Sequence, residues 1–466
     1  SSKKGLVYDE AQLIASVTSV ASIAIKNARI SILDACAILK KLMFFHTDAE
    51  ALSNIECRAR EKTLDSVLNE IKNMEKEYYL DTAATTYVAD EVIDVITDTM
   101  RNIYGNPSSL HTKGRQAYEV AHKATKIIAE YINCKPSEIV FTSGACEANS
   151  LAILGFIRKH KNVAVIQSVI EHKSIALLRD SNAACDEKIL FNRVKVDTDG
   201  FVRLDDLESQ LAFFAHQHFT PLVTIQAANS EIGTIQHIKE ISQLVHKYNG
   251  IYHCDATQLF PYQRIDVKEL GIDMMSVSGQ KIHTPKGIGF LYVKYGIELE
   301  PLIYGTQNRG VRGGTENVPY IVGLGKAIQL LDKTLSEQEL GHPQVYYVRN
   351  YLMNRIKENI DSCMINGSFV AERLPNNINV SFKNIDAQSL ITLLDTEGIY
   401  VSAGSACDAH GMSVSHVLQA IRVPNDYIKG TIRITLPDDF GFEDADYIVE
   451  RLTEHVRILR KFGVDE

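Results

Sequence analysis

Apolar residues in the first part of the chain recur at the spacing of an α-helix. Residues 8–77 contain neither glycine nor proline. The spacing of three and four residues is followed by Leu13, Val17, Val20, Ile23 and Ala24, and again by Leu64, Val67, Leu68 and Ile71. The pattern predicts a helical extension over residues 1–77. Two roles fit it equally: a domain that docks a partner or regulates the protein, and a helical cap packed on the main body.

From Tyr78 onward, short apolar runs alternate with helical patterns. The predicted strands are Ile139–Thr142, Val163–Gln167, Val223–Gln226, Tyr252–Cys254, Met274–Val277 and Gly289–Val293. Helical patterns between them include Glu147–Arg158 and Ile238–Tyr248. Strands that alternate with helices indicate a mostly parallel sheet covered on both faces. Ligands of such sheets gather beyond the carboxyl ends of the strands.

The last part of the chain mixes helical and strand-like segments. Helices are predicted over about Glu337–Asn359, Ala387–Glu397 and Glu443–Phe462, and strands over Asn377–Ser381 and Thr431–Leu436. We therefore predict a large α/β domain over residues 92–334. A smaller α+β domain is expected to combine residues 78–91 with residues 335–466.

Composition and charge exclude several classes of protein. The chain has 466 residues, 45% of them hydrophobic, which is enough for two or three domains with a sizeable core. Its formal net charge of -9 argues against direct binding to nucleic acid. No apolar run reaches the roughly 18 residues of a membrane helix. Ser1–Lys4 are not followed by the apolar stretch of a secretion signal. We therefore expect neither a membrane nor a nucleic-acid partner.

The eight cysteines are scattered along the chain, and none forms a CxxC pair. This distribution is typical of a reduced, cytoplasmic enzyme rather than of a disulfide scaffold. The nearest approach to a metal-ligand cluster is His253 with Cys254, or His410 with Cys407. Neither has the spacing of a zinc site, and we predict no metal.

Two motifs could hold parts of one ligand. FTSGACEAN (141–149) reads as a strand, a glycine turn and a helix start, whose unpaired N–H groups suit a phosphate. Many such turns bind nothing. HCDATQ (253–258) places Asp255 just after an apolar strand, where a carboxylate could keep a pyridine nitrogen protonated. An aspartate in that position is more commonly a helix cap.

Two further motifs supply reactive groups. SVSGQKIHTPKGIGFLYV (276–293) places Lys281 between two apolar runs, where a desolvated amine can form a Schiff base. Lys286, in a Pro-Lys-Gly turn, reads as an ordinary solvated lysine. VSAGSACDAHGMS (401–413) surrounds Cys407 with small residues, a setting that suits an exposed, reactive thiol. Taken alone, the motif fits an ordinary unreactive cysteine equally well.

Together and in this order, the four motifs resemble the cysteine desulfurases of the NifS/IscS-like group, within the class V aminotransferase family. The resemblance covers the chain from about Tyr78 to its end, and it extends to YLDTAATT (79–86), YGNPSSLH (104–111), EHKSI (171–175), NSEIG (229–233), RGVRGGTEN (309–317) and IRITL (432–436). It implies the cofactor pyridoxal 5'-phosphate. It also implies the fold type I of these enzymes, an α/β large domain with a mostly parallel sheet plus a small α+β domain. Residues 1–77 lie outside it.

The resemblance also implies roles for individual residues. Lys281 matches the lysine that holds the cofactor, and Asp255 the partner of its ring nitrogen. Gln258 and Ser230 match positions near the ring hydroxyl, and His172 matches the histidine that stacks on the ring and is proposed to move protons. Positions of the phosphate site are matched by Gly144, Ala145, Cys146, Ser278 and Gln280.

Further positions concern the substrate and a second subunit. Arg433 matches the arginine that binds the substrate carboxylate, as suits its two-pronged donor geometry, and Asn106 is expected to contact substrate as well. Thr315 matches a phosphate contact made from the other subunit, which implies a homodimer. Cys407 matches the nucleophile that takes sulfur from L-cysteine as a persulfide, leaving L-alanine. A sulfur-acceptor protein, such as a scaffold or a thiolation enzyme, is then implied as a partner.

Three positions depart from the family pattern. Cys146 stands in place of threonine, Ser230 in place of asparagine and Gln280 in place of histidine. Each lost hydrogen bond would cost on the order of 1 kcal/mol, so an active but specialised enzyme is expected. Two other functions compete with the desulfurase. One is another class V lyase, acting on cysteine or selenocysteine without a persulfide. The other is a catalytically weakened scaffold protein.

Overall fold

The computed structural model describes residues 76–180, 189–338, 344–369, 372–403 and 414–462. The helices predicted before residue 76 and the predicted nucleophile Cys407 lie outside these ranges. The chain forms two compact units. In the described part of the smaller unit, Tyr78 N–H donates to the Gly398 carbonyl at 2.8 Å, and Tyr400 O–H donates to Glu77 at 3.1 Å. This unit also contains the strand β11 (Ile399–Tyr400) and the first residue of the strand β1 (Tyr78–Tyr79).

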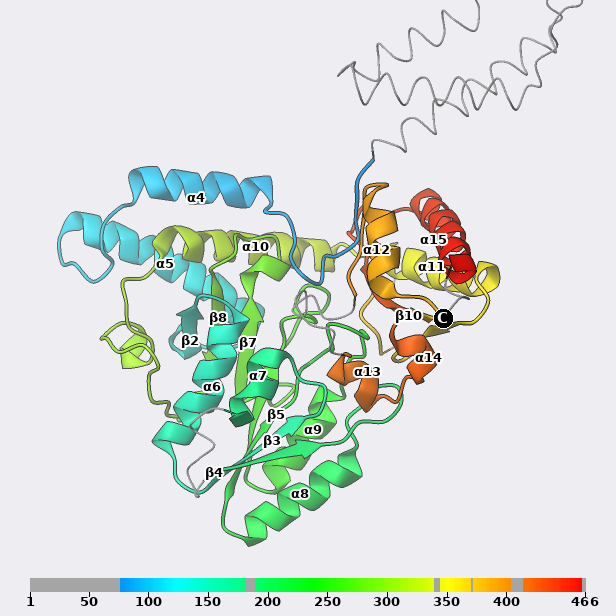
Figure 1. The fold of residues 1–466 in the computed structure, drawn as a ribbon. Coiled ribbons are helices and arrows are strands. Elements are labelled where there is room, and N and C mark those ends of the chain that lie inside the picture. The colour runs from blue at the N-terminus through cyan, green and yellow to red at the C-terminus, as the bar shows by residue number, and fades with distance from the viewer. Residues whose placement is uncertain (1–75, 181–188, 339–343, 370–371, 404–413, 463–466) are drawn as a thin grey trace, which may run out of the picture. The chain divides into compact units, whose positions relative to one another are not determined.

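The larger unit is built on a seven-stranded sheet with the order β2-β8-β7-β6-β5-β3-β4 (Figure 1). Pairing is parallel from β7 through β6, β5 and β3 to β4, whereas β8 runs antiparallel to both β7 and β2. The strands are β2 (Ile139–Thr142), β3 (Val163–Ser168), β4 (Ile189–Val194), β5 (Thr220–Thr224), β6 (Ile251–Asp255), β7 (Met274–Ser278) and β8 (Gly289–Val293). The predicted mostly parallel sheet is confirmed.

Both faces of the sheet are covered, as the uninterrupted apolar strands indicated. In β3, Ala164 and Ile166 belong to one hydrophobic cluster, while Val163 and Val165 belong to another. Successive residues of a strand point to opposite faces, so each cluster is the core on one side of the sheet. All six residues of β3 are buried.

Helices connect and flank these strands, and Figure 1 shows α10 lying along α4 and α5. The α-helices of this part are α4 (Asp90–Asn102), α5 (Thr112–Tyr131), α6 (Ala145–Lys159), α7 (Lys173–Ala176), α8 (Leu204–His216), α9 (Ile238–Lys247) and α10 (Val318–Ser336). Short 3₁₀ turns are η1 (Pro136–Glu138), η2 (Leu177–Asp180), η4 (Gly279–Lys281) and η5 (Asn308–Gly310). In the described part of the chain, no helix is both long and apolar enough to cross a bilayer.

A second, three-stranded antiparallel sheet has the order β12-β10-β9, with strands β9 (Cys363–Ile365), β10 (Asn377–Phe382) and β12 (Thr431–Thr435). The helices of this region are α11 (Gln344–Asn359), α12 (Ala387–Asp395), α13 (His416–Ala420), α14 (Asn425–Ile428) and α15 (Phe442–Phe462). Helix α11 packs on α15 and on the sheet.

Three details of the predicted elements were wrong. The helix expected from about Glu337 corresponds to α11 (Gln344–Asn359), and Glu337 itself is the C-cap of α10. The strand predicted from Val223 begins at Thr220, and it contains Pro221 where pairing with β6 has not yet started. Strand β4 was not predicted, because polar and exposed residues interrupt its apolar pattern at the edge of the sheet.

Candidate cofactor site at the carboxyl ends of the strands

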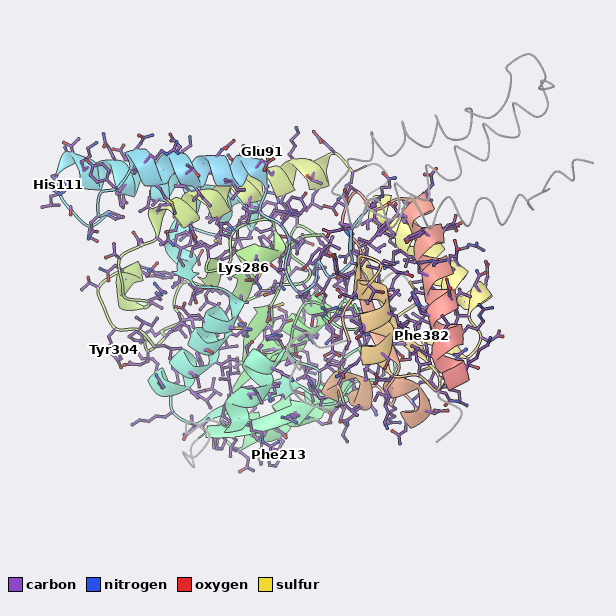
Figure 2. The ribbon with its side chains drawn as sticks, turned by 45° about the horizontal axis from the view of Figure 1, so that its top comes forward. Glu91, His111, Phe213, Lys286, Tyr304 and Phe382 are labelled. Carbon is purple, nitrogen blue, oxygen red and sulfur yellow. The ribbon has the colours of Figure 1, made fainter. Side chains whose placement is uncertain are left out.

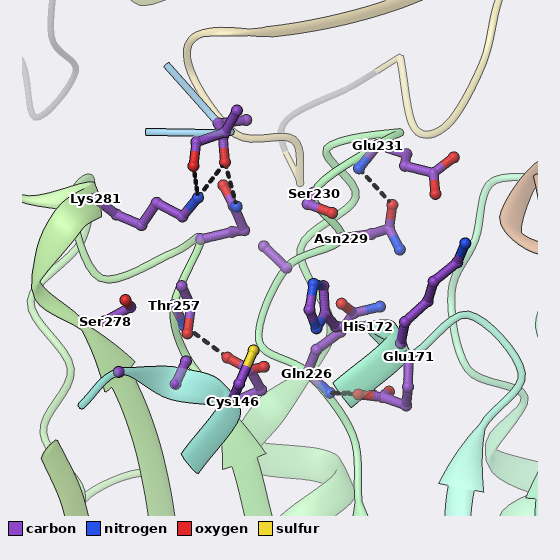
Figure 3. Close-up of a pocket in the computed structure, with 18 of the residues that line it drawn as sticks. Cys146, Glu171, His172, Gln226, Asn229, Ser230, Glu231, Thr257, Ser278 and Lys281 are labelled. Atoms are coloured by element: carbon purple, nitrogen blue, oxygen red, sulfur yellow. Dashed lines mark hydrogen bonds between the residues drawn. The ribbon is translucent and has the colours of Figure 1, made fainter. Parts of the chain in front are cut away.

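A cavity of about 370 Å³ lies where the parallel strands end. Residues that follow β2, β3, β6 and β7 line it, together with the turn at Ala83 and Ala84 and with Arg433 of β12. The side chains of Lys281 and His172 extend into this cavity in Figure 3. The sequence had placed a ligand at this edge of the sheet.

Most of the predicted site residues come together in this cavity. Its lining includes Gly144, Ala145, Cys146, His172, Ser230, Asp255, Gln258, Ser278, Gln280, Lys281 and Arg433. Asn106 and Thr315 do not line it, and both are exposed. The amide oxygen of Asn106 instead accepts a hydrogen bond from Ser108 N–H at 2.9 Å. Cys407 lies outside the described residues.

The glycine turn before α6 brings a helix start to the cavity. Gly144 has φ +152° and ψ -176°, a conformation that is essentially restricted to glycine. A Cβ on Gly289 would come within 2.5 Å of the Val277 carbonyl oxygen and 2.8 Å of Gly144 Cα. Both residues must therefore be glycine for this turn to approach β7. The first N–H groups of α6 have no partners within the helix, so they could bind an anion beside Ser278.

Lys281 ends the turn η4, three residues beyond β7. Its amine donates hydrogen bonds to the carbonyl oxygens of Ala83 and Ala84. Gln258 approaches the same segment, because its side-chain amide donates to the Ala83 carbonyl at 3.0 Å. The segment after β1 therefore forms one wall of the cavity and fixes the direction of the lysine side chain.

Asp255 is the last residue of β6, next to β7 in the sheet. Only 7% of its surface is exposed. One carboxylate oxygen accepts from the Asn149 amide at 2.8 Å, and the other accepts from Thr257 N–H at 3.0 Å. Asp255 and Lys281 therefore line one cavity from the ends of neighbouring strands, and their contact with one ligand stays a prediction.

Two ionisable residues follow β3. Glu171 is fully buried, and burial raises the pKa of its carboxyl group well above the ordinary value, although both oxygens accept from Gln226 N–H at 3.1 Å. Burial lowers the pKa of the adjacent His172, so its imidazole favours the neutral form. His416 donates to the backbone carbonyl of Glu171 across 3.0 Å.

Arg433 forms a buried ion pair at the other end of the cavity. Its Nη2 lies 2.6 Å from Asp81 Oδ1, and its side chain is 3% exposed. Nη1 donates to the Ser230 carbonyl at 3.3 Å, whereas Nε has no hydrogen-bond partner among the described residues. A buried guanidinium with an unused N–H can donate a hydrogen bond to a bound carboxylate.

Three residues in or next to the cavity had no role assigned from the sequence: Glu171 lines the cavity, whereas Asn149 and Asp81 bond to its lining residues Asp255 and Arg433. Asn149 and Glu171 lie inside motifs that were singled out, and Asp81 lies in YLDTAATT. Their position inside these motifs was the indication in the sequence that they belong to the site. Their function depends on contacts with distant parts of the chain, which spacing does not reveal.

Known proteins resemble this chain over most of its length. The class-V aminotransferase family model matches residues 78–446. A cysteine desulfurase IscS of Dictyoglomus turgidum is 38% identical over 397 residues, which cover 84% of this chain and 98% of that protein. A solved NifS-like protein is 33% identical with a TM-score of 0.74, over 82% of this chain and 100% of the other. A structure of SspA in complex with cysteine is 33% identical with a TM-score of 0.66, and the match covers 78% of this chain and 99% of the other. This chain belongs to the class-V aminotransferase family.

Proposed function

We propose that the protein is a pyridoxal-phosphate-dependent cysteine desulfurase that converts L-cysteine to L-alanine and carries the released sulfur on Cys407. One observation carries the proposal: the Lys281 amine and the Asp255 carboxylate line one cavity between a helix start and a buried arginine. The named cysteine desulfurases among the relatives support the reaction type.

The residues present fit the cofactor. The helix start at Gly144 offers N–H groups for a phosphate, and Thr257 Oγ has no hydrogen-bond partner among the described residues although it is buried. The phosphate would be held by Ala145, Cys146, Ser278 and Gln280, with Thr315 reaching it from a second copy of the chain. Gln258 and Ser230 would lie beside the ring hydroxyl. When bound, the cofactor withdraws electrons from the α-carbon of an amino acid.

The chain's own residues supply the other parts of the reaction. Asp255, desolvated and fixed by two hydrogen bonds, keeps a proton on the ring nitrogen. Arg433 binds the substrate carboxylate through donors that Asp81 and Ser230 leave unused. Lys281, which would hold the cofactor, would also remove the α-proton of the substrate with its amine.

Sulfur transfer then requires a thiolate, because a neutral thiol is a poor nucleophile. The Cys407 sulfur forms a bond to the substrate sulfur as the substrate Cβ–S bond breaks. The electron pair of the broken bond stays with the carbon, which takes up a proton and leaves as alanine. The resulting persulfide passes its terminal sulfur to an acceptor protein.

We also propose a homodimer in the cytoplasm. Large apolar side chains are exposed on and between α4 and α5, namely Ile93, Met100, Tyr104, Leu110 and Tyr118. Glu91 and His111 mark the two ends of this surface in Figure 2. Asn106 lies in the same exposed segment, and we propose that it contacts the substrate bound by a second copy. A nucleophilic thiol that must remain reduced suits the cytoplasm.

Mass spectrometry after exposure to L-cysteine tests this function. We expect one additional sulfur atom on Cys407 in the wild type. In Cys407→Ala, alanine formation should fall by at least about 10²-fold because the C–S bond loses its attacking group. Cys363→Ser, at a half-buried thiol, serves as the control and should behave as the wild type. Undiminished alanine and sulfide release by Cys407→Ala would instead indicate a lyase.

Gly144→Ala is expected to weaken cofactor binding by about 10-fold or more, because a β-carbon at this φ strains the turn by about 1–3 kcal/mol and displaces the helix start. Equilibrium titration of cofactor absorbance measures this change. Gly296→Ala is the matched control, since Gly296 also has a positive φ of +97° but has no atom within 4 Å of the added carbon. Equal cofactor affinity in both variants would contradict a phosphate site at Gly144.

A further inference from the structure

A chain of hydrogen bonds connects His172 with Asp255 beneath the cavity. Asn149, on α6, donates through Nδ2 to Asp255 Oδ2 at 2.8 Å and to Ser174 Oγ at 3.0 Å. Ser174 Oγ lies 2.8 Å from His172 Nδ1. Two residues without an assigned role, Asn149 and Ser174, therefore join the two groups expected to contact the cofactor ring.

The direction of the hydrogen bonds at Asn149 is fixed by chemistry. An ionised carboxylate only accepts, so the amide nitrogen of Asn149 must face Asp255. Both hydrogens of Nδ2 are then used, and Oδ1 is left buried without a partner among the described residues. An unpaired buried acceptor costs about 1–3 kcal/mol. Asn149 is fully buried despite this cost, which indicates that its two donated bonds have a function.

The direction at His172 follows from the backbone. Ser174 N–H donates to His172 Nδ1 at 3.1 Å, and a backbone N–H cannot reverse its role. Nδ1 is therefore unprotonated, and the neutral ring carries its hydrogen on Nε2. Because Ser174 Oγ accepts from Asn149, its own hydrogen is available for Nδ1. Both donors at Nδ1 oppose the addition of a proton there.

We propose that Asn149 and Ser174 are positioning residues that hold His172 as the neutral Nε2–H tautomer while they orient Asp255. The catalytic meaning of these roles rests on the proposed function. His172 then stacks as an uncharged ring and offers an N–H to the bound ligand. It does not take up the substrate α-proton at Nδ1, so that proton falls to Lys281.

The groups around His172 agree with a neutral ring. Asp255, at the end of β6, is the nearby charge that favours protonation of His172. Lys281 on η4, His416 on α13 and Lys173 on α7 oppose protonation, and burial opposes it most strongly. The pKa of His172 is lowered as a result.

Nitrogen-15 NMR of histidine-labelled, full-length protein without substrate tests this proposal. His172→Asn identifies the His172 signals by their loss. In the wild type at neutral pH, we expect an unprotonated Nδ1 and a protonated Nε2. Ser174→Ala and Asn149→Ala should each shift the protonation of His172 to higher pH. Ser174→Ala removes a hydroxyl that donates to Nδ1. Asn149→Ala frees that hydroxyl to accept a hydrogen bond from a protonated Nδ1. Ser174→Thr retains the hydroxyl and should restore the wild-type titration.

Ser209→Ala is the matched control, since this serine lies on α8 and its exposed hydroxyl donates to Asp205 O. It should leave the His172 titration unchanged. A protonated Nδ1 in the wild type, or equal titrations in the wild type, Ser174→Ala and Asn149→Ala, would overturn the proposal. These spectra do not depend on turnover. Failure of the desulfurase function would appear separately, as absent alanine formation with the same histidine spectra.

Discussion

Replacing Lys281 with alanine is expected to lower the rate of alanine formation from L-cysteine by at least about 10³-fold. The variant loses both the amine that attaches the cofactor and the base that removes the α-proton. Folding should be preserved, because Lys281 is half-buried in the lining of the cavity and is not part of the hydrophobic core. Single-turnover alanine formation and the absorbance of bound cofactor measure the two losses separately.

Lys286→Ala is the matched control for that experiment. Lys286 lies five positions farther along the same loop and is exposed, so its removal should leave both readouts at wild-type values. A Lys281→Ala protein that retained more than about a tenth of the wild-type rate would contradict the role of Lys281 as base.

Asp255→Asn is expected to reduce the rate by about 10²- to 10⁴-fold. The amide has the shape of the carboxylate but carries no charge to hold a proton on the ring nitrogen. One of its two polar atoms can still accept from Asn149 or Thr257 N–H, which limits the loss of stability. Steady-state kinetics, with kcat and KM determined separately, should place the effect mainly in kcat.

Asp255→Glu provides the comparison, because it keeps the charge but displaces it by one methylene. We expect a rate between those of the wild type and Asp255→Asn. Thermal unfolding of all three proteins controls for damage to the fold. If the asparagine variant matched the wild type in kcat while binding the cofactor, Asp255 would not be the partner of the ring nitrogen.

The sequence predicted the centre of the sheet better than its edges. The runs at Val163 and Met274 are buried on both faces, so an uninterrupted apolar pattern marks them. At the edge of the sheet, Asn192 and Arg193 of β4 are both exposed, so the strand lacks an uninterrupted apolar pattern. The boundary between α10 and α11 was also missed, because the residues around Glu337 favour a helix and only the backbone shows where α10 ends.

For the site, residues close to strand ends could be predicted, and residues that act through long-range contacts could not. Asp255 and Lys281 follow apolar strands directly, so the sheet itself brings them together. The contact of Asn149 with Asp255 joins positions far apart in the chain. Asn106 and Thr315 remain predictions, because a single chain places neither in the cavity.

The contact between Gly289 and Gly144 also limits how the protein can be redesigned. Strand β8 is antiparallel to its neighbours, so its first residue, Gly289, lies against the turn before α6. The distance between Gly289 and this turn is set by main-chain atoms alone. A smaller side chain elsewhere cannot make room for a methyl group at Gly289, because the atoms that it would meet belong to the main chain, and at Gly144 the positive φ itself opposes a β-carbon. Variants designed to accept a bulkier analogue of pyridoxal 5'-phosphate should therefore change Cys146 or Ser278 and keep both glycines.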